Sequence, residues 1–260
     1  MDAPLYARRI DGRRVARAAA ATATAVIAIW RTPKQRRLAL AIAAAVLSAV
    51  AFARIAEDYL TNDPLARWDL TFARWLSGER STIGTDFFRA VTFLGSPATV
   101  AAVAAVACVV LYRRRRLDEA ALLPVVFAIA ELLNVVLKLS FHRARPEVAS
   151  VHLDTYSFPS GHAMMSTAVY GGFAYLAWSR VRGPRARVAL VLGTAAFLAL
   201  ICFSRLYLGV HYLSDVLAGA AGGAFCLAVA VALQAIYGDR FARSFADSRA
   251  DRLARRATRS

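Results

Sequence analysis

The stretch FPSGHAMMSTAVYGGFAYLAWSR, residues 158–180, places a short polar cluster directly before an apolar run. The run Ala163–Ser179 has no charged side chain and approaches the ~20 residues that a helix needs to cross a bilayer. Pro159-Ser160-Gly161-His162 is an unusual start for such a helix. Polar groups at the membrane boundary are costly and therefore indicate a functional site.

Five further apolar stretches of comparable length alternate with short arginine-rich segments: Leu38–Ala53, Ala90–Tyr112, Ala120–Leu137, Val188–Ser204 and Val216–Gly238. A water-soluble helix has an apolar stripe and a polar face, whereas these stretches are apolar on all sides. The chain as a whole is 58% hydrophobic. The sequence therefore predicts an all-α polytopic membrane protein with six transmembrane helices.

The segment between the first two predicted spans, residues 55–89, mixes aromatic and charged side chains. This pattern predicts short interfacial helices in the first outer loop, with the aromatic rings at headgroup depth. Gly95-Ser96-Pro97 should interrupt the second span near its outer end. The shorter run Ala18–Trp30 predicts a helix that lies on the membrane surface or packs on the bundle.

The formal net charge of +16 arises from basic residues concentrated in four places, 1–37, 113–116, 180–187 and the tail after Gly238. Positively charged loops stay in the cytoplasm, so both termini should be cytoplasmic and the active site extracytoplasmic. The chain then divides into a basic N-terminal segment 1–36, a six-helix domain 37–238 and a charged tail 239–260. A bacterial inner membrane is the expected location. No nucleic-acid-binding motif accompanies the dispersed basic residues, so no nucleic-acid partner is predicted. Three cysteines inside apolar runs suggest neither a disulfide framework nor a metal site.

Two loops on the predicted outer side carry polar residues at the membrane boundary, Lys138–His162 and Ser204–Asp215. Lys138, Arg145 and Arg205 supply cationic donors that match phosphate oxygens. Ser160 suits a helix N-cap, and Gly161 lets the backbone approach a ligand. Because a helix N-terminus presents free N–H groups, these residues predict a site for a tetrahedral dianion.

His211 and Asp215 are four residues apart, a spacing that places both side chains on one face of a helix. The carboxylate would fix the imidazole tautomer and leave the other ring nitrogen as a nucleophile. His162, in the other loop, suits general acid–base work. Together with the cations, this inventory fits attack on phosphorus through a phosphohistidine.

Three further polar residues leave alternatives open. Arg143 either adds to the cationic cluster or is a headgroup contact or a solvated charge. Glu131 and Asn134 lie on one helical face with Lys138. They either form a buried polar shell behind Lys138 or act as polar contacts between helices.

The motifs K-x6-R-P at Lys138–Pro146, P-S-G-H at 159–162 and S-R-x5-H-x3-D at Ser204–Asp215 resemble the three-part signature of the type 2 phosphatidic acid phosphatase family. The resemblance implies that His211 is the nucleophile, Asp215 its orienting partner and His162 the acid and base. It implies that the phosphoryl group binds Lys138, Arg145, Ser160, Gly161 and Arg205. It implies no metal and no cofactor. Vanadium haloperoxidases share the signature but resemble soluble proteins, which the six predicted spans disfavour.

The resulting prediction is an integral membrane lipid phosphatase whose partners are a lipid phosphate substrate and the surrounding membrane lipids. Undecaprenyl pyrophosphate is the first substrate expected by analogy, followed by phosphatidylglycerol phosphate and phosphatidic acid. Two alternatives remain open at this point. One is a phosphotransferase that passes the phosphate to another lipid, and the other is a transporter that only binds lipid phosphate.

Overall fold

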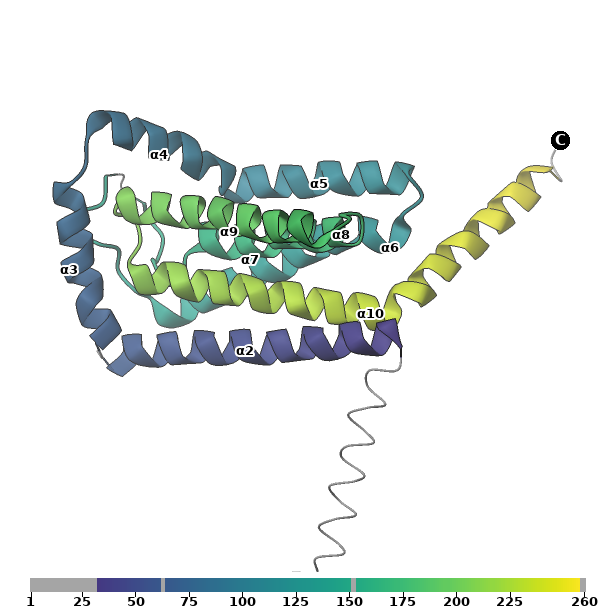
Figure 1. The fold of residues 1–260 in the computed structure, drawn as a ribbon, viewed down its shortest axis with the longest axis horizontal. Helices are drawn as coiled ribbons and strands as arrows, with labels where there is room; N and C mark the ends of the chain where they lie inside the picture. Colours follow the sequence, from purple (N-terminus) through teal and green to yellow (C-terminus); the bar gives the residue numbers. More distant parts are fainter. Residues whose placement is uncertain (1–31, 62–63, 151–152, 258–260) are drawn as a thin grey trace, which may run out of the picture.

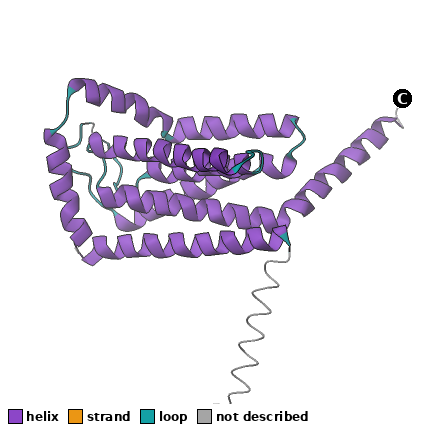
Figure 2. Ribbon diagram, in the orientation of Figure 1, coloured by secondary structure: helices purple, strands orange, loops and turns teal. Residues whose placement is uncertain are grey.

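The computed structural model describes residues 32–61, 64–150 and 153–257, in which helices are joined by loops without any strand (Figures 1 and 2). The helices are α2 (Pro33–Thr61), α3 (Pro64–Gly78), α4 (Thr82–Leu94), α5 (Pro97–Arg113), α6 (Leu117–Ala120), α7 (Leu122–Phe141), α8 (Gly161–Trp178), α9 (Pro184–Tyr207) and α10 (Leu213–Ala257). The predicted all-α fold is confirmed over these ranges. The stretch Ala18–Trp30 lies outside them, so its surface helix stays a prediction.

Four helices are long and apolar enough to cross a membrane, namely α2, α7, α9 and the part of α10 up to Gly238. The helices α4 and α5 qualify together as a fifth span that is bent by 41°. The predicted count of six is therefore not confirmed. The helix α8, predicted as the fourth span, is 18 residues long but does not qualify, because its glycines, hydroxyl residues and His162 reduce its hydropathy.

The predicted break at Gly95-Ser96-Pro97 is confirmed, because α4 ends at Leu94 and α5 begins at Pro97. The Ser96 hydroxyl caps α5 by accepting a hydrogen bond from the Thr99 N–H group at 3.2 Å. Proline follows at the first helical position, where its missing N–H group costs nothing.

The segment 55–89, predicted to hold short interfacial helices, contains α3 and the first part of α4, and α3 runs across one end of the bundle (Figure 1). One face of α3 is buried through Asp69, Ala73 and Leu76. The other face exposes Trp68 and Trp75, at 66% and 59% of their surface. Tryptophan rings favour the membrane–water interface, so this helix is suited to lie at headgroup depth.

The helix α8 is packed among α7, α9 and α10 in the middle of the bundle. Gly219 and Gly223 of α10 face it so closely that an added Cβ atom would overlap the carbonyl oxygens of Ser160 and Met164. Such small residues let membrane helices approach each other. This approach brings the start of α8 beside the start of α10, and it places the two polar loops together.

The helix α10 does not stop at the predicted boundary near residue 238 but continues to Ala257. Figure 1 shows this last part leaving the bundle at the end opposite α3, where α2 also begins. The basic segment 113–116, between α5 and α6, lies at that same end. The three cysteines are free.

Candidate active site

The polar loops predicted from the sequence meet at the end of the bundle that α3 crosses. The backbone N–H group of Ser160 donates to the Asp215 carbonyl oxygen at 2.9 Å, which joins the two loops directly. Ser160 and Asp215 are fully buried, and His211 is only 3% exposed. The side chains at this meeting point are therefore shielded from solvent.

His211 and Asp215 contact each other, with the Nδ1 and Oδ2 atoms 3.3 Å apart. The contact is not made on one helical face, because α10 begins only at Leu213 and His211 lies in the loop before it. Asp215 instead sits in the first turn and also accepts the Tyr212 N–H group at 2.9 Å. An Nδ1–H donor to this carboxylate leaves Nε2 as the free nitrogen, 3.4 Å from Nη1 of Arg145.

The pKa of His211 is lowered well below its ordinary value of 6.5. Burial is the main cause, because it disfavours the charged imidazolium. The cationic groups of Arg205, Arg145 and Lys138 lower the pKa further. His211 is therefore neutral near pH 7, which is the form that can attack an electrophile.

The three predicted cations surround this imidazole and are held by neighbouring oxygens. Arg145 donates to the carbonyl oxygens of Thr155 and Val210 at 2.8 and 2.6 Å. Burial lowers the pKa of Arg145, and the Asp215 carboxylate opposes that shift. Lys138 donates to the carbonyl oxygen of Tyr156.

Arg205 approaches from α9 and donates to the Thr92 hydroxyl of α4 at 2.7 Å. Its Nε atom is buried and has no hydrogen-bond partner. A buried guanidinium donor without a partner is costly, so this atom is suited to bind an anion. Thr92 was not predicted, because only the fold brings α4 to this site.

Ser160 is the N-cap residue of α8, as predicted, but its hydroxyl makes no capping hydrogen bond. The Oγ atom is instead buried without a partner. At Gly161 a Cβ atom would lie 2.9 Å from Oδ1 of Asn134, so the turn packs tightly on α7. The N–H groups at a helix start and an unpartnered hydroxyl are donors of the kind that suit an anion.

His162 follows on the same turn, and its electrostatic neighbours are Arg205, His211, Arg145 and Lys138. The structure thus brings both imidazoles and all three cations of the prediction into one cluster.

Arg143 is neither a solvated charge nor a headgroup contact, since it is only 7% exposed. Its Nη1 atom donates to Asp215 Oδ1 at 2.6 Å, and Nη2 donates to Asp69 Oδ2 at 2.8 Å. The guanidinium lies between the rings of Tyr59 and Tyr212, 4.4 and 4.2 Å from their centroids. Burial alone would lower the pKa of Arg143, but the two carboxylates raise it.

Asp69 is a site residue that the sequence analysis missed. It comes from α3, is 1% exposed and accepts the backbone N–H group of Ser214 at 2.9 Å. It therefore caps the N-terminus of α10 from another helix and also binds Arg143. The sequence did contain a pattern that could have indicated Asp69. Its spacing with Ala73 and Leu76 puts a lone carboxylate on the apolar face of α3.

Asn134 supports the start of α8 rather than bonding to Lys138. Its amide donates to the Pro159 carbonyl oxygen at 3.4 Å and lies 3.7 Å from the Met164 sulfur atom. Glu131 has one carboxylate oxygen buried without a partner, and it acts on Lys138 only through its charge.

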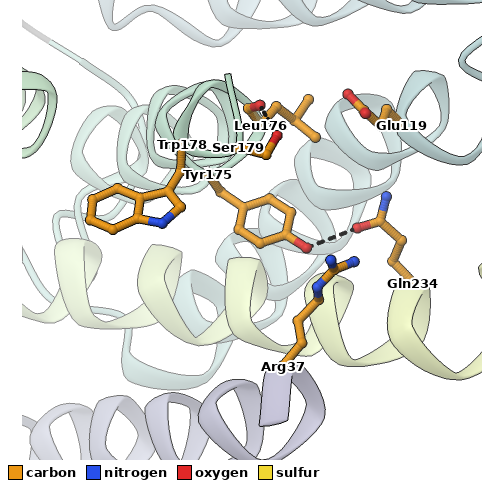
Figure 3. Close-up of a pocket in the computed structure, with 7 residues that line it drawn as sticks. All are labelled: Arg37, Glu119, Tyr175, Leu176, Trp178, Ser179 and Gln234. Carbon is orange, nitrogen blue, oxygen red and sulfur yellow. Dashed lines mark hydrogen bonds between the residues drawn. The ribbon is translucent and has the colours of Figure 1, made fainter. Parts of the chain in front are cut away.

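A cavity of about 440 Å³ adjoins the site and is lined in part by Arg143, Arg145 and Tyr156. The cavity in Figure 3 lies at the opposite end of the bundle and is lined by no residue of the three motifs. Within the described ranges, no group of three or more His, Cys, Asp or Glu side chains is arranged for a metal ion.

The fold and the cluster define a helical membrane protein in which three polar motifs bring cationic and imidazole side chains together at one end of the bundle. Residues 119–237 match the family model of the PAP2 superfamily. The predicted resemblance is thereby confirmed.

Two curated relatives match part of the chain. Phosphatidylglycerophosphatase B of Bacillus subtilis is 39% identical over 107 residues, which cover 40% of this chain and 53% of the relative. Lipid A 1-phosphatase of Rhizobium etli is 38% identical over 112 residues, which cover 38% of this chain and 44% of the relative. The chain thus spans about half the length of these relatives.

One solved structure resembles the fold over most of its length. It is the transmembrane PAP2 type phosphatidylglycerolphosphate phosphatase from Bacillus subtilis, with a TM-score of 0.65 and 27% sequence identity. The similarity covers 72% of this chain and 93% of that chain.

Proposed function

We propose that this protein is an integral membrane phosphatase that hydrolyses a lipid phosphate through a phosphohistidine at His211. The observation that carries the proposal is that hydrogen-bond donors without a partner lie around the neutral imidazole of His211. Ser160 Oγ and Arg205 Nε are buried without partners, beside Lys138 and Arg145. A phosphate group would satisfy these donors and lie next to Nε2 of His211.

In the first step, Nε2 of His211 attacks phosphorus and the bond from phosphorus to the lipid oxygen breaks. His162 transfers its proton to that oxygen, so the lipid leaves as a neutral alcohol, or as a monophosphate if the substrate is a pyrophosphate. A bound phosphate dianion favours the protonated form of a neighbouring imidazole, which prepares His162 for this role. The cations and the N–H groups of α8 stabilise the charge on the phosphoryl oxygens.

In the second step, His162 accepts a proton from water, which attacks the phosphohistidine. Inorganic phosphate leaves and His211 returns to its neutral form. Asp215 holds the Nδ1–H group throughout and stabilises the positive charge that the ring acquires. Arg143 and Asp69 act as positioning residues, because they fix Asp215 and the first turn of α10.

Among the substrates expected from the sequence, phosphatidylglycerol phosphate has the most support. A phosphatidylglycerophosphatase appears both among the curated relatives and among the similar solved structures. Undecaprenyl pyrophosphate, the first expectation, has no comparable support. The donors described above bind the terminal phosphate, which these lipids share.

The active site is proposed to face the extracytoplasmic side of a bacterial inner membrane. The basic segment 113–116 and the start of α2 lie at the other end of the bundle (Figure 1). Basic segments remain on the cytoplasmic side during insertion. The exposed tryptophans of α3 would then contact the outer leaflet, from which the lipid substrate enters.

The test is phosphate release by the purified protein in bilayers, with a panel of phosphatidylglycerol phosphate, phosphatidic acid and undecaprenyl pyrophosphate. We expect release from at least one lipid by the wild type and none by His211→Ala. Transfer of label to an acceptor lipid without free phosphate would replace the phosphatase by a phosphotransferase. Lipid binding that is equal in both proteins, without any release, would replace it by a transporter.

A further inference from the structure

A groove far from the active site lies between α5 and α8. It is an apolar groove of about 590 Å³, walled by side chains such as Val106, Ala107 and Phe173. Its size is that of a ligand site for a small organic molecule. Val106 and Val110 on its wall are 65% and 44% exposed, so the groove opens toward the surrounding lipid.

Three arginines, Arg114, Arg116 and Arg180, line the same groove. They come from the turn after α5 and from the residues after α8, so they lie together at the end opposite the active site. A groove with an apolar wall and a cationic end matches one ligand chemistry, an acyl chain joined to an anionic headgroup.

The arginine end is held in place by Glu119 of α6. Arg180 donates to both carboxylate oxygens of Glu119, at 2.9 and 2.7 Å, and Arg116 donates to one of them. One carboxylate therefore positions two guanidinium groups, and the three side chains together carry a net positive charge. Arg114 adds a further charge, because its side chain makes no ion pair with another described residue.

The turn itself is built to present these side chains. Arg115 has a φ of 61°, in the left-handed region that costs an L residue with a side chain about 1–2 kcal/mol. This turn reverses the chain after α5 and returns Arg116 to the groove.

The cavity in Figure 3 is a neighbour of this groove and shares Leu176 with it. Glu119 and Arg37 line that cavity but do not line the groove.

We infer that this groove binds an anionic phospholipid of the leaflet opposite the active site, with the phosphate on the arginines and one acyl chain between α5 and α8. The inference needs only that the chain lies in a membrane, and it is independent of the phosphatase proposal. Arginine forks bind phosphate oxygens bidentately, and anionic lipids are the phosphate-bearing ligands available at a basic membrane face.

The simpler explanation is that these arginines only set membrane topology. Two neighbouring arginines distinguish a topology signal from a binding site. Arg113 and Arg114 are adjacent and exposed, but only Arg114 lines the groove. A topology signal depends on both residues equally, whereas a binding site depends on Arg114.

The experiment measures lipids retained by the purified full-length protein, using native mass spectrometry after exchange with phosphatidylglycerol or phosphatidylcholine of identical chains. We expect the wild type to prefer phosphatidylglycerol, and Arg114→Gln to lower that preference about fivefold, the effect of one basic residue at an anionic surface. Ala102→Phe, which fills the apolar wall, should lower retention of both lipids. Arg113→Gln should change neither.

Two results would overturn the inference. One is equal retention of the two lipids by the wild type. The other is an equal loss of preference in Arg113→Gln and Arg114→Gln, which would assign the effect to diffuse surface charge. Thermal unfolding of each variant serves as a folding control that does not depend on the phosphatase proposal.

Discussion

Arg143 links Asp215, the carboxylate beside the proposed nucleophile, to Asp69 of α3, and its removal is the most informative perturbation of the site. Its two ion pairs, at 2.6 Å to Asp215 and 2.8 Å to Asp69, join side chains that are at most 8% exposed. Arg143→Gln leaves both carboxylates buried without their cation. Breaking a buried pair in this way costs about 3–5 kcal/mol.

A loss of that size is large compared with the roughly 5–15 kcal/mol that stabilises a typical fold. For a chain of this length it corresponds to a fall of about 6–20 °C in the melting temperature. Without Arg143, the charge of Asp69 has lost this cationic partner. Asp69→Asn should therefore lower the free energy of unfolding much less in the Arg143→Gln background than in the wild type. A double-mutant cycle should report a coupling of about 0.5–3 kcal/mol.

The catalytic effect should appear in kcat rather than in KM, because Arg143 does not contact the phosphate in the proposed mechanism. We expect a loss of tenfold or more in kcat, but less than the roughly 10⁴-fold loss seen when the orienting carboxylate of a serine protease triad is replaced. Arg143→Lys should recover part of the melting temperature.

The assays are thermal unfolding and initial rates of phosphate release in bilayer nanodiscs. Arg89→Gln is the control, since its pair with Asp86 is exposed and spans 3.5 Å, and it should change neither quantity measurably. An Arg143→Gln protein with wild-type melting temperature and kcat would refute the positioning role.

Four other variants test separate parts of the site and fold. His211→Asn should reduce phosphate release to background while the melting temperature stays near that of the wild type, and retained turnover would exclude the phosphohistidine. Because protonated His211 cannot attack, and because burial and cations lower its pKa, the acid limb of kcat/KM should lie below pH 6.5. Arg205→Gln removes one of those cations, so the limb should move to higher pH, and an unmoved limb would contradict the assignment. Gly223→Ala should cost about 1–3 kcal/mol through overlap with the Met164 carbonyl group, whereas Gly193→Ala, which meets nothing within 4 Å, should stabilise by about 0.5–1 kcal/mol in thermal unfolding.

The sequence predicted the helices whose apolar runs are continuous, and it predicted the break at Gly95-Ser96-Pro97 from local backbone chemistry. It was less successful for α8. That helix is surrounded by other helices, so it does not need lipid-facing side chains, and it is not apolar enough to qualify as a span. The number of spans therefore depends on packing that composition alone does not report.

The motif residues were predictable because each motif is short and its side chains are chemically unusual at a membrane boundary. Arg143, Asp69 and Thr92 were misjudged or missed for the opposite reason. Their partners are 72, 145 and 113 residues away in the sequence, so their roles exist only after the helices have packed. Arg143 in particular looks like a surface charge until α2 and α3 cover it.

The predicted site residues and the residues that hold them in place come from different parts of the chain. Every predicted catalytic and phosphate-binding residue lies within 119–237, the segment that matches the family model. The side chains that hold them, Tyr59, Asp69 and Thr92, come from α2, α3 and α4, which precede that segment. The helix α3 also exposes tryptophans suited to the membrane interface, so the element that caps α10 is the one suited to lie at the headgroups. In the proposed mechanism, the position of the nucleophile would therefore be tied to the membrane surface through helices outside the matched segment, and chemistry and orientation would be supplied by different parts of the chain.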